Sequence, residues 1–356
     1  MAAAATAWAN PSSVHRFGRR ANGGLDAART AIAAALGCPA RNIVFTGGGT
    51  EALGLALAQG GRHLISAVEH DAVRAQASGA SVIPVDANGV IDLAALDAML
   101  TALRPLPNAM LAMVERPRDT PAEAGRPLVA VMHVNNETGV IQPVAEVAAL
   151  VARHGGRLLV DAVQSAGKLP LPLADFVAVS AHKLGGPPGV GALIVRDAVT
   201  ATARGGGQER GQRAGTENLP GIAGFAAALG ARAADTGWLD RVTALRDRLE
   251  AQLPGAVIHG AGAARLGTIS CIGLPGVVAM TQLMTLDIAG FAVSAGAACS
   301  SGKVKTSHVL GAMGVAARAS GEAIRVSLGW RTTADEVDAF AAAWRAMAAR
   351  LGRAAA

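Results

Sequence analysis

The sequence contains no tyrosine, and its aromatic residues amount to only 3% of the chain. Proteins that hold single-stranded nucleic acids stack the bases on aromatic side chains. The net charge of +6 and the pI of about 10 arise from basic residues that are scattered along the chain and form no cluster. Because a basic patch is the usual electrostatic signature of nucleic-acid binding, the composition argues against such a partner.

Long apolar runs are absent as well. No run reaches the roughly 18–20 residues that a helix needs to cross a bilayer. Residues 1–9 are rich in alanine but lack the basic start of a signal peptide. We therefore expect a cytoplasmic protein without a membrane partner.

Cysteine is scarce, with Cys38, Cys271 and Cys299 as its three occurrences. An odd, sparse set fits a reducing compartment, and it excludes a disulfide framework and a Cys-x-x-Cys metal site. Cys299 lies among small residues, and two lysines follow it closely, so its thiolate, the reactive form, is favoured. We interpret Cys271 as a buried strand thiol and Cys38 as a turn residue, and we expect no metal site.

Lysine is nearly absent too, since only four of the 32 lysine and arginine residues are lysine. Arginine stays protonated, whereas lysine can lose its proton and attack a carbonyl carbon. Lys183 follows the apolar run 176–179 and precedes glycines, which predicts an amine at the carboxyl edge of a sheet, where ligands bind. The pattern indicates a Schiff-base lysine for pyridoxal phosphate (PLP), although alone it also fits a solvated loop lysine.

The length and the abundant residue types are those of a globular enzyme. The chain has 356 residues, 51% of them hydrophobic, and 44 glycines. Apolar, β-branched runs alternate with helical stretches such as 51–58, 93–103 and 144–154. This alternation predicts an α/β fold with a mostly parallel, seven-stranded sheet covered by helices on both faces. The expected strands are 43–45, 63–66, 81–85, 128–134, 158–163, 176–180 and 192–195.

The length suggests two domains. We expect a large cofactor-binding domain over 1–235. Residues 236–356 would form a linking helix, about 238–253, and a smaller α+β domain with strands near 268–274 and 323–329 and a last helix near 334–351. Residues 105–127 contain five prolines and read as a surface insertion, in which 110–114 is a possible extra strand.

Two strand ends offer candidate cofactor contacts: one runs into glycines, and the other ends in an aspartate. In residues 46–51 a strand runs into three glycines and then into a helix with Thr50 near its start, so backbone N–H groups form an anion site; the same pattern fits an ordinary tight turn. Asp161 ends an apolar strand, where its carboxylate can pair with a pyridinium nitrogen or cap the next helix. Gln164 is placed to reach the same ligand.

Two further strand ends carry imidazole and amide groups. His70 follows the strand 63–66 and can stack on a flat ring and move protons, or serve as a cap. Asn135 and Asn136 follow the strand 128–134, where their amides can donate to a ring oxygen or a carboxylate. Asparagine and glycine also favour a plain turn at this position.

Taken together, these motifs resemble cysteine desulfurases of the NifS/IscS type, which are PLP-dependent enzymes of fold type I in the class V aminotransferase family. The sequence around Cys299 resembles the NifS/IscS branch rather than the SufS branch. The matching stretches follow the family order over nearly the whole chain: 10–15, 46–51, 69–70, 135–139, 161–168, 180–191, 205–218, 297–310 and 325–329.

The resemblance implies a cofactor site centred on Lys183, which would form the Schiff base with PLP. His70 would stack on the ring and move protons. Thr216 would reach the phosphate of the other subunit, which implies a homodimer. The remaining cofactor contacts implied are Asp161 to the pyridinium nitrogen, Gln164 to the ring oxygen, Asn136 near the ring, and Gly49, Thr50, Ser180 and His182 to the phosphate.

The resemblance also implies the reaction. Asn136 and Arg325 would hold the carboxylate of L-cysteine, and Cys299 would attack the substrate sulfur. The products would be L-alanine and a Cys299 persulfide, which passes to an acceptor such as an iron–sulfur cluster scaffold or serves another thiolation.

The chain departs from the family at its start. Family members carry a strand with a Leu-Asp-Asn-Ala-Ala-Thr-Thr-like sequence before the motif at 10–15, whereas residues 1–9 resemble the tail of the following helix. We therefore expect the strand segment to be missing, through a late start assignment or in the protein itself. Two alternative functions follow: a related PLP lyase (selenocysteine lyase or cysteine desulfhydrase), or an impaired dimeric scaffold protein.

Overall fold

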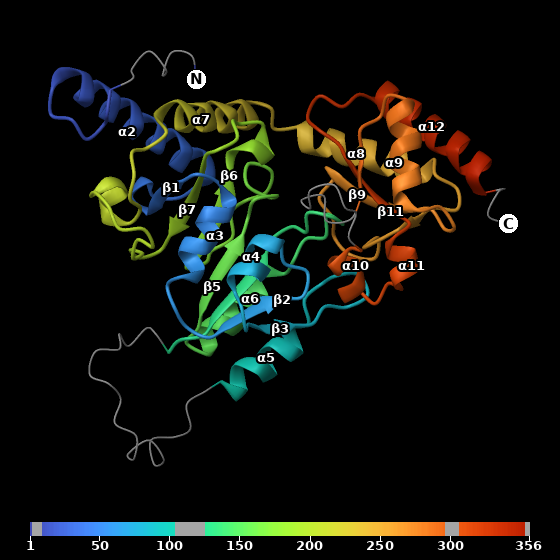
Figure 1. Cartoon of the computed structure of the whole chain (residues 1–356), viewed down its shortest axis with the longest axis horizontal. Helices are drawn as coiled ribbons and strands as arrows, with labels where there is room; N and C mark the ends of the chain where they lie inside the picture. The colour runs from blue at the N-terminus through green and yellow to red at the C-terminus, as the bar shows by residue number, and fades with distance from the viewer. Residues whose placement is uncertain (2–8, 104–124, 296–305, 353–356) are drawn as a thin grey trace. The chain divides into compact units, whose positions relative to one another are not determined.

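The computed structural model describes residues 1, 9–103, 125–295 and 306–352. The possible strand at 110–114 and Cys299 with its neighbouring lysines lie outside the described residues. The described chain separates into two compact units, coloured from blue to red along the chain in Figure 1. None of the helices in these ranges is long and apolar enough to cross a membrane.

The first unit comprises residues 1–83, 92–133 and 143–235, and it is built on a seven-stranded sheet of order β1-β7-β6-β5-β4-β2-β3. All neighbouring strands from β6 to β3 pair in parallel, while β7 is antiparallel to both β6 and β1. The predicted mostly parallel sheet is thereby confirmed. The strands are β1 (Ile43–Thr46), β2 (His63–Ser66), β3 (Ser81–Ile83), β4 (Leu128–Met132), β5 (Arg157–Asp161), β6 (Phe176–Ser180) and β7 (Gly191–Val195).

Both faces of this sheet are covered, because every residue of β1, β4, β5, β6 and β7 is buried and successive side chains point to opposite faces. One hydrophobic cluster joins α3 and α4 to β1, β5, β6 and β7. The helices α2 and α7 pack against each other along their lengths (Figure 1). The helices are α2 (Arg16–Leu36), α3 (Gly49–Leu57), α4 (Asp71–Gln76), α5 (Leu93–Ala102), α6 (Val144–Arg153) and α7 (Leu219–Ala234), with the 3-10 turns η1 (Ala40–Asn42), η3 (Ala181–Leu184) and η4 (Gln208–Gly211).

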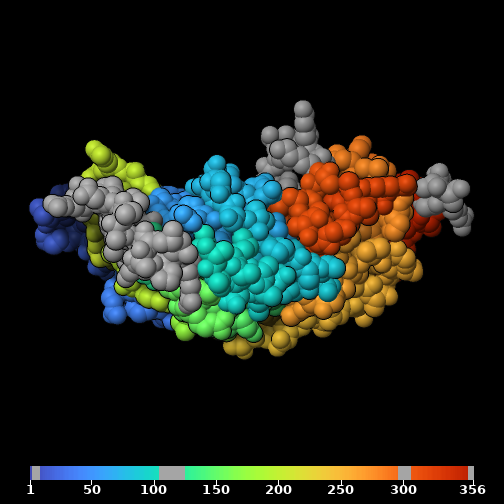
Figure 2. Space-filling view, turned by 90° about the horizontal axis from the view of Figure 1, so that it is seen from below, coloured from blue at the N-terminus to red at the C-terminus, as the bar shows by residue number. Residues whose placement is uncertain are grey.

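The second unit comprises residues 84–91, 134–142 and 236–356, and it contains a four-stranded antiparallel sheet of order β10-β11-β9-β8. Its core gathers apolar side chains of α8, α9, α12 and the sheet around the fully buried Trp344. Residues of α10 and α11, red-orange in Figure 2, contribute to the surface of this unit. The elements are α8 (Trp238–Ala251), β8 (Val257–Ile258), β9 (Ile269–Gly273), α9 (Ala279–Ile288), β10 (Ser294–Ala295), α10 (His308–Ala312), α11 (Ala317–Ser320), β11 (Ala323–Ser327) and α12 (Ala334–Gly352).

The two short segments that belong to the second unit each connect a strand of the first unit to its next helix, β3 to α5 and β4 to α6. Gln142 links them: its side-chain amide donates to the carbonyl of Gly89 at 2.7 Å, and its oxygen accepts the N–H of Ile91 at 2.9 Å. The N–H of Ile141 donates to the carbonyl of Ala264 at 2.8 Å. Each segment thus has hydrogen-bond partners within the second unit.

Candidate active site

The candidate site lies where the strands of the first unit end. The strands β1, β2, β4, β5 and β6 share one direction, so their carboxyl ends meet at a single edge of the sheet. Asp161 is the last residue of β5 and Ser180 the last of β6. The sequence placed these two groups at strand ends, and the structure brings them to the same edge.

The turn between β1 and α3 needs glycine, at one position for its backbone conformation and at another for close packing. Gly48 has φ 149° and ψ −179°, a conformation that only glycine adopts readily. A Cβ on Gly49 would lie 2.7 Å from Cγ2 of Val163, and one on Gly191 would lie 2.6 Å from the carbonyl oxygen of Val179. Side chains are therefore disfavoured at Gly48 by conformation and at Gly49 and Gly191 by close packing. The first turn of α3 presents its N–H groups at this turn.

Polar side chains stand beside this helix start. The Cβ that Gly49 lacks would lie 3.6 Å from Cβ of Ser180, which places the Ser180 side chain next to the turn. Oγ of Ser180 and Nδ1 of His182 are 2.9 Å apart. Thr50 is exposed in the first turn of α3. Helix N–H groups with hydroxyls form a suitable cradle for a phosphate.

Asp161 is the buried carboxylate of the site. Its Oδ1 accepts the N–H of Val163 at 2.9 Å. Burial raises the pKa of Asp161, while the N–H of Val163 and the charges of His70 and Lys183 oppose that rise. His70 and Lys183 therefore lie close enough to act on this carboxylate, and a cationic ring nitrogen would stabilise its charged form further.

His70 performs a structural task while it faces this carboxylate. It precedes α4, and its Nδ1 accepts the N–H of Ala72 at 3.0 Å, so the capping role that the sequence left open is present. A neutral imidazole whose Nδ1 accepts a hydrogen bond carries its proton on Nε2. The cap thereby sets the tautomer, with the proton on Nε2.

Glu69 is a buried acid within the matching stretch 69–70, and the sequence motifs assigned it no role in the site. Its side chain is fully buried and accepts the N–H of Met132 at 2.6 Å. Burial, and then the nearby Asp161, raise the pKa of Glu69 well above its usual range. Ionisation of Glu69 is therefore disfavoured while Asp161 is charged. The signal available in the sequence was an acid directly beside the candidate histidine.

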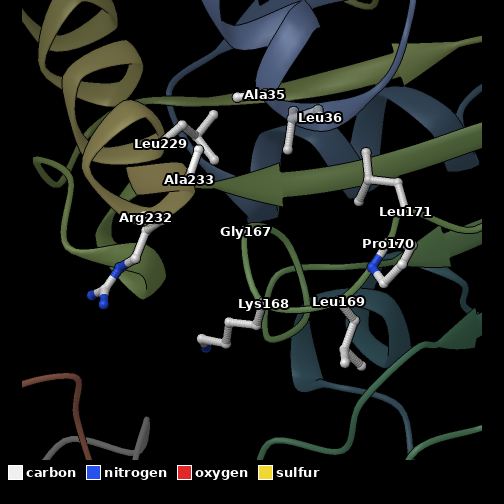
Figure 3. A pocket seen from close by; sticks show the side chains of 10 residues that line it. All are labelled: Ala35, Leu36, Gly167, Lys168, Leu169, Pro170, Leu171, Leu229, Arg232 and Ala233. Carbon is white, nitrogen blue, oxygen red and sulfur yellow. The ribbon is translucent and has the colours of Figure 1, made fainter. Parts of the chain in front are cut away.

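Lys168 lies behind the site. Its Nζ donates to the carbonyl of Gln164 at 2.8 Å, so it supports the backbone of a candidate cofactor residue. Burial, together with the charges of Arg232 and Lys183, lowers the pKa of Lys168 to about 8. Lys168 and Arg232 both line a cavity of about 250 Å³ whose walls are otherwise mostly apolar (Figure 3).

The low pKa of Lys168 predicts how the free energy of unfolding changes with pH. An unfolded lysine has a pKa near 10.4, so between about pH 8 and 10.5 the unfolded chain holds a proton that the folded chain has released. At pH 7 the folded state therefore carries the full free-energy cost of burying the charged amine of Lys168. This cost falls as the pH rises through this window. We expect Lys168→Met to raise the free energy of unfolding at pH 7 by on the order of 2 kcal/mol, with the gain disappearing near pH 10.5.

Urea unfolding of the cofactor-free protein at pH 7 and pH 10 measures this difference. Lys168→Arg is the matched control, since it keeps the charge and should show no gain at either pH. A Lys168→Met effect that does not change with pH would contradict the assigned cause.

The second unit holds the remaining polar candidates. Nη1 of Arg325 in β11 donates to the backbone carbonyl of Asn136 at 3.0 Å, and Nη2 donates to Oγ of Ser294 at 3.3 Å. Nε of Arg325 is buried and meets no hydrogen-bond partner among the described residues. A guanidinium held in this way has donors left for a carboxylate.

The turn around Asn136 is built by its neighbours. Oδ1 of Asn135 accepts the N–H groups of Glu137 and Thr138, both at 2.9 Å, which is the turn role that the sequence left open. Oγ of Ser307 donates to the buried Glu137 at 2.5 Å. This bond ties the residues that follow the Cys299 segment to the asparagine turn.

Comparison with known proteins names the family. Residues 4–110 and 122–340 match the family Aminotransferase class-V. The chain belongs to this family. A cysteine desulfurase of Cereibacter sphaeroides is 41% identical, over 92% of this chain and 86% of that protein. The cysteine desulfurase IscS of Dictyoglomus turgidum is 34% identical, over 92% of this chain and 84% of that one.

A solved structure agrees with this assignment to the class-V aminotransferases. The NifS-like protein from Rickettsia africae superposes with a TM-score of 0.83 at 31% identity, over 95% of this chain and 91% of that chain. The resemblance to NifS/IscS-type enzymes and the fold expected from it are thereby confirmed.

The remaining candidates of this class-V aminotransferase are less closely tied to the site. Thr216 is exposed in the segment between η4 and α7. Cys271 lies in β9, where burial raises the pKa of its thiol to about 12, and Cys38 is half-buried after α2 with a pKa that burial also raises. Neither of these thiols has the low pKa of a reactive cysteine. Cys299 lies outside the described residues.

Proposed function

We propose that the protein is a cysteine desulfurase that uses PLP to take sulfur from L-cysteine, giving L-alanine and a persulfide on Cys299. The observation that carries the proposal is the edge of the first sheet, where the glycine turn, the buried Asp161 and Lys183 meet. This donor set matches a flat cationic ring with a phosphate and an aldehyde. The cysteine desulfurases among the relatives support the choice of reaction.

The residues of the first unit fit the cofactor. The amine of Lys183 would bind its aldehyde carbon, and Asp161 would pair with its protonated ring nitrogen. When bound, PLP supplies an electron sink for the bonds to the substrate's α-carbon. The other contacts that we propose are Gln164 to the ring oxygen, His70 and Asn136 at the ring, Gly49, Thr50, Ser180 and His182 to the phosphate, and Thr216 of a second copy to the same phosphate.

His70 and Lys183 would transfer the protons of the reaction. Because Ala72 fixes Nδ1 of His70 as an acceptor, Nε2 is the atom that holds or donates a proton. The amine of Lys183, once released from the cofactor, serves as the second proton carrier. The raised pKa of Glu69 disfavours a second negative charge near Asp161, the carboxylate that would pair with the ring nitrogen.

Substrate recognition falls to Arg325 with Asn136. The two contacts to Asn136 and Ser294 orient the guanidinium, whose remaining N–H groups would bind the substrate carboxylate. The amide of Asn136 would add a donor to the same carboxylate.

The sulfur step uses Cys299 as a nucleophile. Its thiolate attacks the substrate sulfur, so a sulfur–sulfur bond forms while the carbon–sulfur bond of cysteine breaks. The electron pair of that bond stays with carbon, which takes a proton and leaves as the methyl group of alanine. A thiolate of the acceptor would then attack the outer sulfur: the sulfur–sulfur bond of the Cys299 persulfide breaks, the acceptor keeps the outer sulfur as its own persulfide, and Cys299 leaves as a thiolate.

The partners follow from this chemistry. We propose a homodimer, in which Thr216 completes the phosphate site of the other copy, and a thiol-bearing acceptor of the iron–sulfur assembly or thiolation type. Cys38 and Cys271, the cysteines within the described residues, are both free thiols, which favours a reducing, cytoplasmic setting.

The test is a product balance. Purified protein with PLP, L-cysteine and a reductant should give alanine and sulfide in equal amounts. Pyruvate in place of alanine would instead identify a cysteine desulfhydrase, and turnover of selenocysteine alone would identify a selenocysteine lyase. Bound cofactor without any product would overturn the enzyme assignment and favour a scaffold protein.

A further inference from the structure

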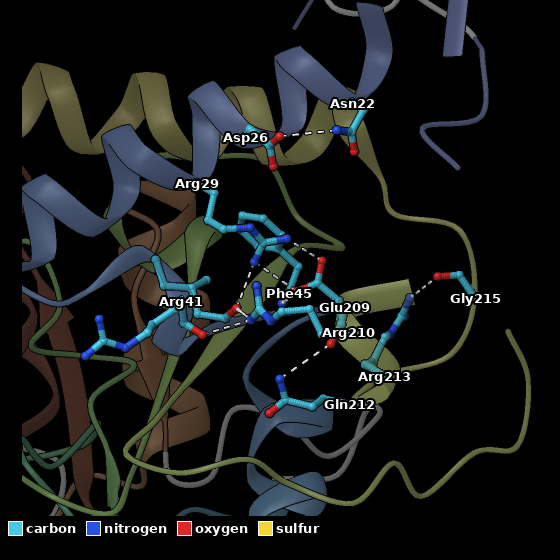
Figure 4. A network of polar contacts seen from close by, with 11 residues as sticks. Asn22, Asp26, Arg29, Arg41, Phe45, Glu209, Arg210, Gln212, Arg213 and Gly215 are labelled. Atoms are coloured by element: carbon cyan, nitrogen blue, oxygen red, sulfur yellow. Dashed lines mark hydrogen bonds and ion pairs between the residues drawn. The ribbon is translucent and has the colours of Figure 1, made fainter. Parts of the chain in front are cut away.

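The segment 205–218 is anchored at its start by a buried ion pair. The side chain of Glu209 is fully buried and binds Arg29 of α2 through two hydrogen bonds of 2.6 and 2.9 Å. The same carboxylate accepts the N–H of Phe45 in β1 at 3.0 Å, and Arg29 lies over the Phe45 ring, 4.4 Å from its centre (Figure 4). These contacts attach the segment to both α2 and β1.

The backbone is strained at Glu209 and Arg210. The hydrogen bonds of the buried Glu209 side chain hold the chain in this conformation. Glu209 and Arg210 have φ values of 47° and 58°, and they are the two non-glycine residues with positive φ in the described chain. The left-handed region is unfavourable for residues with a Cβ, so both residues adopt it at a cost. At its other end, Asn218 caps α7 by accepting the N–H of Gly221 at 3.1 Å. Residues 213–217 therefore form an arch between two fixed points.

Arg213 connects this arch to the phosphate turn. Its Nε donates to Oε1 of Glu51 at 2.8 Å, and its Nη1 donates to the carbonyl of Gly215 at 3.3 Å. Oε2 of Glu51 also accepts the N–H of Gly47 at 2.6 Å. One guanidinium thus touches both the residue that fixes the glycine turn and the residue that precedes Thr216.

The charge of Glu51 explains why the guanidinium matters. Glu51 lies in the first turn of α3, where the helix N-terminus is prepared for an anion, and an uncompensated carboxylate there repels a phosphate. Burial alone would raise the pKa of Glu51, but the hydrogen bonds from Arg213 and Gly47 hold it below its ordinary value, so Glu51 stays charged. Arg213 neutralises this charge and leaves Glu51 free to align the N–H of Gly47.

We propose that Arg213 is a positioning residue for two phosphate sites: it neutralises Glu51 beside the phosphate of its own chain and holds the Gly215 carbonyl so that Thr216 reaches the phosphate of the partner chain. The proposal rests on the proposed function, since it takes the glycine turn as the PLP phosphate site and the protein as a homodimer. Arg213 touches neither cofactor nor substrate and acts through Glu51 and Thr216.

PLP dissociation, measured by equilibrium dialysis and cofactor absorbance, tests the first half without any turnover. We expect Arg213→Met to raise the dissociation constant roughly three- to tenfold, because it exposes the phosphate to the charge of Glu51. The double variant Glu51→Gln/Arg213→Met should bind PLP more tightly than Arg213→Met alone, since the repelling charge is gone. A merely structural role predicts the reverse, with the double variant weaker still.

Arg196→Met is the matched control. It removes an exposed arginine of the same unit that is paired with Asp175 at 3.2 Å, and it should leave PLP binding unchanged. The cofactor-free Arg213→Met protein should unfold at the temperature of this control. If wild type binds PLP and Arg213→Met binds it equally well, the inference is wrong; if wild type itself fails to bind, the proposed function is wrong.

Mixed dimers test the second half. One chain carries both Lys183→Ala and Arg213→Met, and the other is wild type, so lysine-bound PLP forms only in the wild-type chain, whose own Glu51–Arg213 pair is intact. We expect weaker PLP retention there than in a mixed dimer whose altered chain carries Lys183→Ala alone. Equal retention in the two mixed dimers would overturn the role of Arg213 toward the partner chain.

Discussion

Lys183→Ala is expected to abolish the formation of alanine from L-cysteine. Lys183 lies in η3, the turn that begins directly after Ser180, and the charge of its amine acts on the buried Asp161. Its loss removes both the covalent attachment of the cofactor and a proton carrier. General acid–base catalysis alone contributes roughly 10²–10⁴-fold, so we expect kcat to fall by at least about a thousandfold. Alanine quantified over time by chromatography provides the measurement.

Lys183→Arg separates chemistry from charge. Arginine keeps the positive charge near Asp161 but cannot attack an aldehyde carbon at neutral pH. Both variants should lose the absorbance band of lysine-bound PLP, and the cofactor-free proteins should unfold like wild type because the Lys183 side chain is exposed. An arginine variant with substantial turnover would show that charge, and not the amine, is what the reaction needs.

Cys299→Ser is expected to remove persulfide formation and, with it, release of sulfide in the presence of a reductant. The oxygen of serine is a poor acceptor for sulfur, so we expect turnover to fall by at least about a thousandfold, as for the loss of other nucleophiles. The absorbance of bound PLP should stay as in wild type. Single-turnover alanine formation and mass spectrometry of the intact protein measure the two parts of this result.

Cys38→Ser is the matched control for this variant. Cys38 is half-buried after α2, and burial raises the pKa of its thiol, so it is a weak nucleophile. We expect full activity and an unchanged persulfide signal from it. Full sulfide production by Cys299→Ser would refute the desulfurase mechanism and favour a lyase that needs no thiol.

Local sequence patterns predicted most of the sheet. Buried parallel strands are short apolar runs that end in polar or glycine residues, and that pattern located all seven strands of the first unit to within a few residues. The deviations have local causes. β3 ends at Ile83 because a proline follows and cannot donate to the ladder. β5 ends at Asp161, since its side chain takes up the N–H of Val163 and turns the chain.

Local sequence patterns could not predict contacts between residues that lie far apart in the chain. Arg29 and Glu209 are 180 positions apart, and nothing near either residue marks it as half of a buried pair. The supporting groups of the site share this property: Glu69 takes its hydrogen bond from Met132, and Arg213 finds Glu51 across 162 positions. The motifs predicted which groups face a ligand, and the fold alone reveals which groups hold them in place.

The division of the chain between the two units has a consequence for synthesis on the ribosome. Residues 84–91 and 134–142 belong to the second unit, and the carbonyl that Ile141 needs is that of Ala264. When the first 235 residues have emerged, these two segments still lack the rest of their unit, because it has not been translated. A nascent chain must therefore carry two unfinished loops until its last third arrives, and a stop codon near residue 235 would leave both permanently exposed to proteases.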